Sequence, residues 1–329
     1  MREPPGRSAS ILPKVIGCLK GIATGDAIGK QTENLSREDV SRWYPDGVRG
    51  FEGPPGSVIP RYLGNTKRKW RFGETTDDTE RTIAVARAIL GDREVRHESV
   101  GRELLKCEKC VHPGIASLWE FHQEGDPARV AQRHDGCGAA IRVAPVGILY
   151  RSHRLDEIVA AAREASISTH GGPLAIAAAA ATAAAVSAAV EGAPPLEVMA
   201  AARQGAIQAE LLWPGSLNHS FSRALSDVHD DLRRREPSPA VIAARYFPNN
   251  PLTIVPLALG LATIMESAEA STLLAANVGG DSDSVASIAG AILGARCPET
   301  INDEWCSVVE QVNGHNLEPL ASQLAALRS

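Results

Sequence analysis

The sequence predicts an all-α protein built as a single domain. Aromatic residues make up only 4% of the 329 residues, whereas Ala and Gly are abundant. Small residues favour closely packed helices, while strands prefer Val, Ile, Tyr and Phe. Apolar side chains also recur at helical spacing near the start of the chain, at Ile11, Val15, Leu19 and Ile22. Because no clear boundary interrupts the chain, we expect one large helical core over residues 11–329.

Residues 1–10 are expected to form a disordered N-terminal tail. They contain Arg2, Arg7 and two prolines but no apolar segment. Chain ends without apolar anchors are usually poorly ordered. The same feature argues against a signal peptide, and the six cysteines are scattered through the sequence. These observations predict a reducing, cytoplasmic location.

The charge of the chain argues against large anionic partners. The formal net charge is -5 at pH 7, so there is no general basic field to attract duplex nucleic acid or an anionic membrane. Residues 174–190 form an uncharged, Ala-rich run, but this run contains Thr182 and Ser187 and is shorter than the ~20 apolar residues a bilayer requires. We expect a buried helix there, no membrane partner and a monomeric protein.

Glycines recur every four residues in the first expected helix, over residues 11–28. Such a stripe allows a second helix to approach closely. Residues 25–30 superficially resemble a phosphate-binding P-loop, but Gln31 stands where Ser or Thr is needed, so that motif is excluded. A long irregular segment is expected over residues 42–73. Later helices are expected from Thr76 through Leu90, over residues 98–124, 155–164, 174–190, 196–212 and 241–269, with turns at Pro251 and Pro256, and from residue 281 through Leu293.

Two acidic stretches far apart in the chain share one chemistry. Residues 75–80 read TTDDTE, and residues 279–284 read GGDSDS. Adjacent carboxylates repel each other, so they call for a cation or for the amides of a helix N-terminus. Carboxylate and hydroxyl oxygens suit Mg²⁺, Ca²⁺ and Mn²⁺. One metal centre built from both stretches is therefore a working hypothesis, while capping of a helix by Asp77 and Asp78 explains the first stretch equally well.

Three smaller motifs are weak by themselves. Cys107-x-x-Cys110 with nearby His112 lacks a second ligand pair, so packing or surface thiols are favoured over zinc. The glycine-flanked turn over residues 136–138 can expose backbone N–H groups to phosphate, although a plain helix start is the simpler interpretation. His170 in a loop is more often a hydrogen-bond partner than a catalytic group.

Taken together, these motifs resemble the ADP-ribosylglycohydrolase family, which includes the dinitrogenase reductase-activating glycohydrolases and the ADP-ribosylhydrolases. The similar blocks fall in family order between about residues 15 and 296. They are Gly21-x-x-x-Gly25-Asp26-Ala27-Ile28-Gly29 with Glu33, then Thr76-Asp77-Asp78-Thr79, Gly136-x-Gly138-Ala139-Ala140-x-Arg142-Val143-Ala144-Pro145, Thr169-His170 and Asn277-x-Gly279-Gly280-Asp281-x-Asp283. The resemblance implies a single compact all-α domain with a binuclear metal cleft.

The resemblance also implies an activity and a set of site residues. The expected reaction is hydrolysis of a glycosidic bond at C1 of an ADP-ribose ribose, with two Mg²⁺ or Mn²⁺ ions. The implied metal ligands are Thr76, Asp77, Asp78, Asp281, Asp283 and Ser284. The implied catalytic residues are Glu33, Asp77 and Asp283. The implied substrate-binding residues are Asp26, Gly136, Cys137, Gly138, His170, Gly279 and Gly280.

Three positions depart from the commonest family pattern. Ser284 replaces the usual Thr but keeps a ligating hydroxyl, whereas Cys137 replaces a frequent Asn and Gly172 stands where many members have a second His. The last two changes leave open a smaller substrate. An N-ribosyl hydrolase acting on a nucleoside or ribosylated metabolite is thus an alternative. A non-catalytic ADP-ribose-binding protein is another alternative. Several intact carboxylates argue against it, because a site without catalytic function gains nothing from uncompensated charges.

Overall fold

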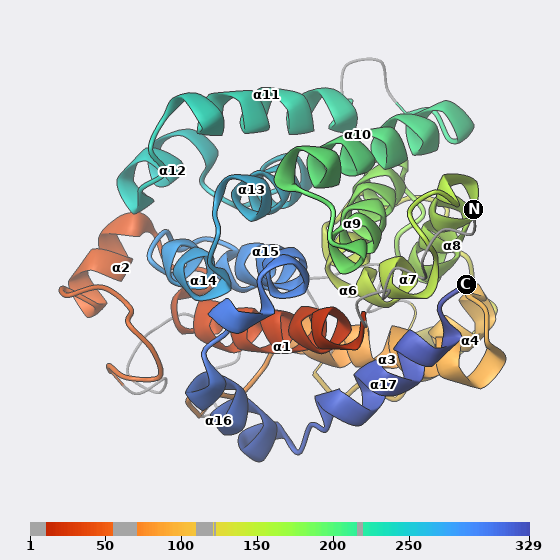
Figure 1. Cartoon of the computed structure of the whole chain (residues 1–329), viewed down its shortest axis with the longest axis horizontal. Coiled ribbons are helices and arrows are strands. Elements are labelled where there is room, and N and C mark those ends of the chain that lie inside the picture. Colours follow the sequence, from red (N-terminus) through yellow and green to blue (C-terminus); the bar gives the residue numbers. More distant parts are fainter. Residues whose placement is uncertain (1–10, 55–70, 110–120, 122, 216–219) are drawn as a thin grey trace, which may run out of the picture.

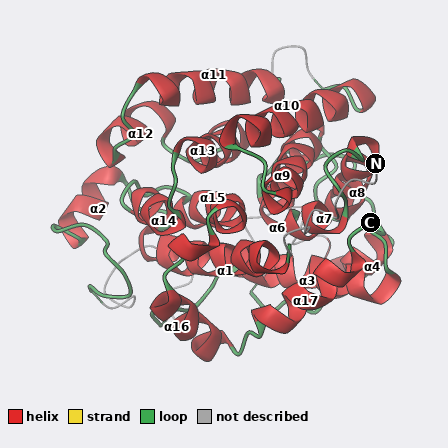
Figure 2. Ribbon diagram, in the orientation of Figure 1, coloured by secondary structure: helices red, strands yellow, loops and turns green. Residues whose placement is uncertain are grey.

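Helices account for the regular secondary structure of this chain. The computed structural model describes residues 11–54, 71–109, 121, 123–215 and 220–329. Within these ranges the chain forms helices and loops without a strand (Figure 2). The all-α prediction is confirmed, and the helices form one compact domain (Figure 1). The predicted tail over residues 1–10, together with Cys110 and His112, lies outside the described residues.

Two helices from opposite ends of the chain lie side by side at the centre of the fold. They are α1 (Leu12–Gly29) and α15 (Ser282–Arg296) (Figure 1). A Cβ atom added to Gly21 would lie only 2.0 Å from the carbonyl oxygen of Gly290. Gly17 meets Gly294 in the same way, so the two helices run antiparallel. The predicted glycine-mediated approach is confirmed, and α15 is the partner.

The other helices surround this central pair. Two short 3-10 helices, Lys30–Thr32 and Pro298–Thr300, follow α1 and α15. The remaining α-helices are α2 (Arg37–Trp43), α3 (Asp77–Asp92), α4 (His97–Leu104), α6 (Gly138–Arg142), α7 (Ala144–Leu149), α8 (Leu155–Ile167), α9 (Pro173–Glu191), α10 (Pro195–Leu212), α11 (Phe221–Arg234), α12 (Pro239–Tyr246), α13 (Pro251–Ile264), α14 (Ala268–Ala276), α16 (Asp303–Asn313) and α17 (Leu317–Leu327).

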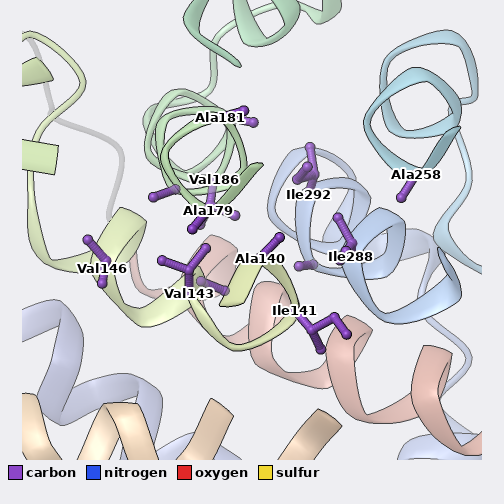
Figure 3. Close-up of a cluster of buried hydrophobic side chains, with 14 of the residues drawn as sticks. Ala140, Ile141, Val143, Val146, Ala179, Ala181, Val186, Ala258, Ile288 and Ile292 are labelled. Carbon is purple, nitrogen blue, oxygen red and sulfur yellow. The ribbon is translucent and has the colours of Figure 1, made fainter. Parts of the chain in front are cut away.

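The Ala-rich helix α9 forms the second core element. Its Ala179 and Val186 lie near Val143, which joins α6 to α7, and on the side facing Ile288 and Ile292 of α15 (Figure 3). Helix α9 is long and apolar enough to cross a membrane, and 89% of its apolar window is buried within the fold. As predicted, it is a buried core helix. Small side chains along α9 allow several helices to pack closely around it.

One predicted helix is interrupted. In the range predicted to be one helix, residues 98–124, α4 ends at Leu104, residues 105–109 form a turn, and residues 121, 123 and 124 are helical again. Beyond it, the backbone N–H groups of Glu108 and Lys109 each donate to the carboxylate of Glu80 at 2.8 Å. These side-chain acceptors replace the helical carbonyls, so the chain turns instead of continuing as a helix.

The apolar stretch over residues 241–269 is also divided differently from the prediction. It forms α12 and α13, and Pro251 begins α13, where a missing N–H costs little. Pro256 was expected at a turn but lies inside α13. The residues from Ile254 to Thr263 are all buried, so core packing of α13 outweighs the loss of one backbone hydrogen bond.

The glycine contact between α1 and α15 can be tested by adding one methyl group. Gly21→Ala places a Cβ against backbone that has no room to move, and we expect a loss of about 3 kcal/mol or more of unfolding free energy. Gly91→Ala is the matched control, because nothing lies within 4 Å of its added Cβ. That change should be neutral or stabilise by up to ~1 kcal/mol. Urea unfolding followed by circular dichroism measures both, and equal stabilities would contradict the close packing.

Candidate functional site

The first acidic stretch begins a helix, as predicted. Thr76 is the N-cap of α3, and its Oγ1 accepts a hydrogen bond from the N–H of Asp78 at 3.1 Å. Asp77 and Asp78 therefore lie in the first turn, where the helix dipole favours negative charge. Capping does explain Thr76, and it leaves the carboxylates of Asp77 and Asp78 available to the cleft described below.

Asp26 holds this turn in place from α1. Its carboxylate accepts hydrogen bonds from the Thr76 N–H at 2.9 and 3.0 Å and from the Thr79 N–H at 3.1 Å. The side chain is fully buried and does not line the cleft. Asp26 was predicted to bind substrate, and in the structure α1 directs its carboxylate to the backbone N–H groups of Thr76 and Thr79. Its observed contacts are those of a positioning residue.

The segment that precedes α3 is held by two residues that we did not predict, Lys109 and Asn313. Lys109 Nζ donates to the carbonyl of Thr75 at 2.7 Å. The N–H of Thr75 donates to Asn313 Oδ1 at 3.1 Å, and Asn313 is the last residue of α16. These contacts join segments more than thirty and two hundred residues apart, so no local sequence signal could have indicated them.

The second acidic stretch is positioned by a glycine turn. Gly279 and Gly280 have φ angles of +89° and +69°, which favour glycine. The Gly280 N–H donates to the carbonyl of Leu35 at 2.8 Å, and its carbonyl accepts from the Asn34 N–H at 2.7 Å. The N–H of Asp281 donates to Pro248 at 2.7 Å. This turn directs the start of α15 toward the start of α3.

A single cleft of about 510 Å³ lies where these elements meet. Most of the predicted site residues line it together: Glu33, Asp77, Asp78, Gly136, Cys137, Gly138, His170, Gly280, Asp281, Asp283 and Ser284. Asp26, Thr76 and Gly279 do not line it and act through the backbone. Residues that we did not predict also line it, namely Asn34, Leu35, Ser36, Arg81, Ile141, Phe247, Pro248 and Asn249.

Burial makes the charged form of several carboxylates in the cleft unfavourable. Burial raises the pKa of Asp78 and of Asp283 well above the usual range, and the neighbouring carboxylates add to the effect. Burial also raises the pKa of Asp281. Ser284 Oγ donates to Asp78 Oδ2 at 3.2 Å, which links α15 to α3. A buried cluster of this kind favours protons or a cation.

Glu33 is a further carboxyl group that lines the cleft. It ends the short 3-10 helix after α1, and Asn34 Nδ2 donates to its Oε1 at 2.9 Å. Desolvation, followed by the charges of Asp281 and Asp77, raises the pKa of Glu33 to about 8. With this raised pKa the carboxyl group of Glu33 is mostly protonated at neutral pH. The protonated form is the one that can donate a proton.

The glycine turn before α6 is fitted closely around His170. A Cβ atom on Gly136 would lie 2.9 Å from His170 Nε2. Burial, with the positive charges of Arg142 and Arg81, lowers the pKa of His170 well below its usual range, so the ring is neutral. Thr169 Oγ1 lies 2.8 Å from its Nδ1. The neutral ring can exchange hydrogen bonds with a ligand without adding charge.

Two departures from the family pattern now have a structural setting. Cys137 Sγ donates to Asp281 Oδ2 at 3.5 Å, and burial beside Asp281 raises the pKa of the thiol, which keeps it protonated. At Gly172, a Cβ would lie 2.1 Å from Asp135 Oδ1. The same Asp135 oxygen accepts from the N–H of Leu174 at 2.8 Å and so caps α9. A second histidine does not fit at Gly172 in this arrangement.

Arg81 is the most informative residue that we missed. It lies one turn after Asp77 on α3 and forms an ion pair with its carboxylate. The i, i+4 spacing of Asp and Arg is the local signal that could have indicated this pair. Its side chain is only 3% exposed, so it places a permanent positive charge at the wall of the cleft.

The residues suit a divalent metal ion, as the resemblance implies. The donors are carboxylate and hydroxyl oxygens, which Mg²⁺ and Mn²⁺ prefer. Asp283 Oδ1 is buried and has no hydrogen-bond partner among the described residues, which is an unusual state that a cation would satisfy. Within the described ranges, no group of three or more His, Cys, Asp or Glu side chains has the arrangement of a completed metal site. The fit thus rests on Asp283 and on the chemistry of the donors.

Comparisons with known proteins agree with this geometry. The family model for ADP-ribosylglycohydrolase matches residues 7–329. The chain is 29% identical over 320 residues to an uncharacterized protein of Archaeoglobus fulgidus, covering 95% of this chain and 96% of the relative. It is 26% identical over 332 residues to the uncharacterized protein YegU of Escherichia coli K12, covering 96% and 97% of the two chains.

More distant similarities point the same way. The chain is 22% identical over 175 residues to the ADP-ribosyl-dinitrogen reductase glycohydrolase of Rhodospirillum rubrum, covering 51% of this chain and 55% of that protein. Its fold is similar to a solved structure described as an ADP-ribosylglycohydrolase-related protein complex, with a TM-score of 0.72 and 22% identity over 97% of this chain and 99% of that one. Because the family match spans nearly the whole chain, the protein belongs to the ADP-ribosylglycohydrolase family.

Proposed function

We propose that this protein hydrolyses the glycosidic bond at C1 of the ribose of an ADP-ribosylated protein or small molecule, with Mg²⁺ or Mn²⁺ as cofactor. The observation that carries the proposal is one cleft that is lined both by Glu33 and by the carboxylates of α3 and α15. Glycoside hydrolysis requires a carboxylic acid that donates a proton and carboxylates that stabilise positive charge on the sugar. The cleft contains both kinds of group.

The volume of the cleft and the activity named for one relative support an ADP-ribosyl substrate. A cleft of about 510 Å³ lies within the range of sites that enclose small ligands. The turn over residues 136–138 can present backbone N–H groups to phosphate, next to the neutral ring of His170. Phe247 lines the same cleft and offers an apolar face for the remainder of the ligand. The activity named for the Rhodospirillum rubrum relative is of the same class.

The reaction follows from the protonation states of the cleft. Protonated Glu33 donates its proton to the leaving atom as the bond to C1 breaks, and the leaving group keeps the electron pair. The positive charge that develops on the ribose is stabilised by the carboxylates of Asp77 and Asp283. Water then adds to C1, and its proton returns to Glu33. The buried setting strengthens each of these electrostatic interactions.

The aspartates at the starts of α3 and α15, with Ser284, would hold the metal ion. When bound, a divalent cation supplies Lewis acidity that orients the sugar oxygens and makes a nearby water more acidic. The role of the chain is to fix the oxygen donors before the substrate arrives. Asp26 does so for α3, and the bond from Ser282 Oγ to the carbonyl of Gly29 at 2.8 Å does so for α15.

One observation favours an N-ribosyl hydrolase for nucleosides as the second candidate. The side chain at the centre of the glycine turn, Cys137, donates to Asp281 and so is turned toward the acidic cluster. It therefore adds no amide donor for a phosphate group. A substrate without a pyrophosphate would not require such a donor.

A substrate panel tests the proposed function directly. ADP-ribosyl-arginine, ADP-ribosyl-serine, O-acetyl-ADP-ribose and simple ribonucleosides are incubated with the protein and Mg²⁺ or Mn²⁺. Chromatography follows the release of ADP-ribose from the first three compounds and of ribose from the nucleosides. We expect hydrolysis of at least one ADP-ribosyl compound, complete inhibition by EDTA, and loss of turnover in Asp283→Ala with unchanged helical circular dichroism. The control is Asp303→Ala, an exposed position in α16.

The other outcomes of the panel separate the competing functions. Cleavage of ribonucleosides alone would support the second candidate. Tight ADP-ribose binding without any turnover would favour a non-catalytic binding protein. Full activity in EDTA would remove the metal from the proposal.

Glu33→Gln tests the proton donor. The amide keeps the size of the side chain but cannot donate an acidic proton, so we expect turnover to fall by about 10²–10⁴-fold. Binding of Mn²⁺ should persist in the same variant. Glu38→Gln, an exposed position on α2, is the control and should leave turnover unchanged. Equal activity in both variants would exclude Glu33 as the acid.

Metal binding is expected to weaken as pH falls. Burial raises the pKa of Asp78 and Asp283, so below the raised values their carboxyl groups carry protons that must leave when a cation binds. Above those values the carboxylates are already ionised, and affinity should reach its plateau. Calorimetry of Mn²⁺ binding in two buffers with different ionisation enthalpies measures the released protons. Identical heats in both buffers, with affinity independent of pH, would contradict this assignment.

A further inference from the structure

Arg81 places a fixed positive charge beside one of the predicted metal ligands. Its guanidinium forms an ion pair with Asp77, one helical turn earlier on α3. An arginine side chain keeps its charge at any accessible pH. A cation bound by Asp77 would therefore compete with a cation that is already part of the protein.

The packing around Arg81 keeps the guanidinium in the cleft. The side chain is only 3% exposed. A Cβ atom on Gly138 would lie 3.1 Å from Arg81 Nη1 and 3.0 Å from His170 Cε1. Arg81 is thus enclosed between α3, the first residue of α6 and the ring of His170. Movement of the guanidinium into solvent would require these neighbours to separate.

The acidic groups of the cleft fall into two different environments. Asp77 has a side chain that is 26% exposed and is paired with Arg81. Asp78 and Asp283 are each only 4% exposed, and within the part of the chain that the structure describes, Asp283 Oδ1 has no hydrogen-bond partner. Ser284 Oγ lies 3.2 Å from Asp78 Oδ2 on the same side. Among the described residues, the buried carboxylate oxygen without a hydrogen-bond partner therefore belongs to α15, whereas the ion pair lies on α3.

We propose that this cleft binds one divalent cation and that the guanidinium of Arg81 takes the place of a second ion. The single ion is held by oxygens of Asp78, Asp281 and Asp283, with Ser284. Asp77 stays paired with Arg81 and is not a ligand of that ion. This inference rests on the proposed function only in requiring that a divalent cation binds.

Counting bound Mn²⁺ ions tests this inference independently of catalysis. The full chain and two variants, Arg81→Gln and Arg87→Gln, are equilibrated with Mn²⁺, and the ions per chain are measured by equilibrium dialysis. Arg87 is an exposed arginine on the same helix and serves as the matched control. We expect one ion per chain for the unaltered protein and for Arg87→Gln, and two for Arg81→Gln. Electron paramagnetic resonance should show an isolated ion in the first two proteins and a spin-coupled pair in the third.

Two further variants decide the question if Arg81→Gln fails to fold. Asp77→Asn should retain one Mn²⁺ ion with an affinity lowered less than about 10-fold, the lower end of what changes outside the ligand shell cost. Asp283→Asn should weaken binding by more than about 100-fold, the upper end of that range. An equal loss of Mn²⁺ affinity in both variants would overturn the inference, because Asp77 would then be a metal ligand just as Asp283 is.

Other results would separate this inference from the proposed function. Two ions bound to the unaltered protein would overturn the role of Arg81 and leave the proposed hydrolysis intact. One ion bound to both the unaltered protein and a folded Arg81→Gln would also overturn it. No Mn²⁺ binding to any form would overturn both the inference and the metal dependence of the proposed function.

Discussion

The close antiparallel contact between α1 and α15 is the constraint on which the site depends. Glycines on both helices allow their backbones to meet where any side chain would collide, as at Gly21 and Gly290. The contact continues to the cleft itself, since a Cβ atom on Gly29 would lie 2.5 Å from the Cα of Asp283. The end of α1 is thereby held against the start of α15. Glu33 and the second acidic stretch share one cleft because of this register.

Folding such a site costs free energy, because several carboxylates must lie close together where few water molecules can solvate them. The raised pKa values of Asp78 and Asp283 are the physical sign of that cost. Positive groups and hydrogen-bond donors of the protein, in place of solvent, offset this free-energy cost. Helix N-termini direct their dipoles at the cluster, Asp26 binds the backbone of α3, and Arg81 neutralises Asp77. The remaining unsatisfied oxygen of Asp283 is where a cation would be stabilised most.

Two residues at or near the cleft distinguish this chain from the commonest family pattern. The glycine contact, the helix starts and the acidic stretches hold the carboxylates of the cleft in place. Cys137 lines the cleft and Gly172 does not, and both differ from the commonest pattern. The contact between Cys137 and Asp281, and the tight packing of Gly172 against Asp135, show that both residues are fitted to their surroundings. Substrate preference of this protein is therefore expected to depend on these two positions.

The resemblance of the ordered motifs to a known family implied most of the residues that line the cleft. The sequence by itself determined the features that depend on local chemistry: the all-α class, the N-cap at Thr76 and the glycine stripe of α1. Local pattern was enough there because helix propensity, capping and small-residue spacing act between near neighbours. Only the tertiary structure decided the role of Asp26, the support of Thr75 by Asn313, and the position of Phe247. These depend on which helices pack together and on the direction in which each side chain then points, and spacing along the chain contains neither.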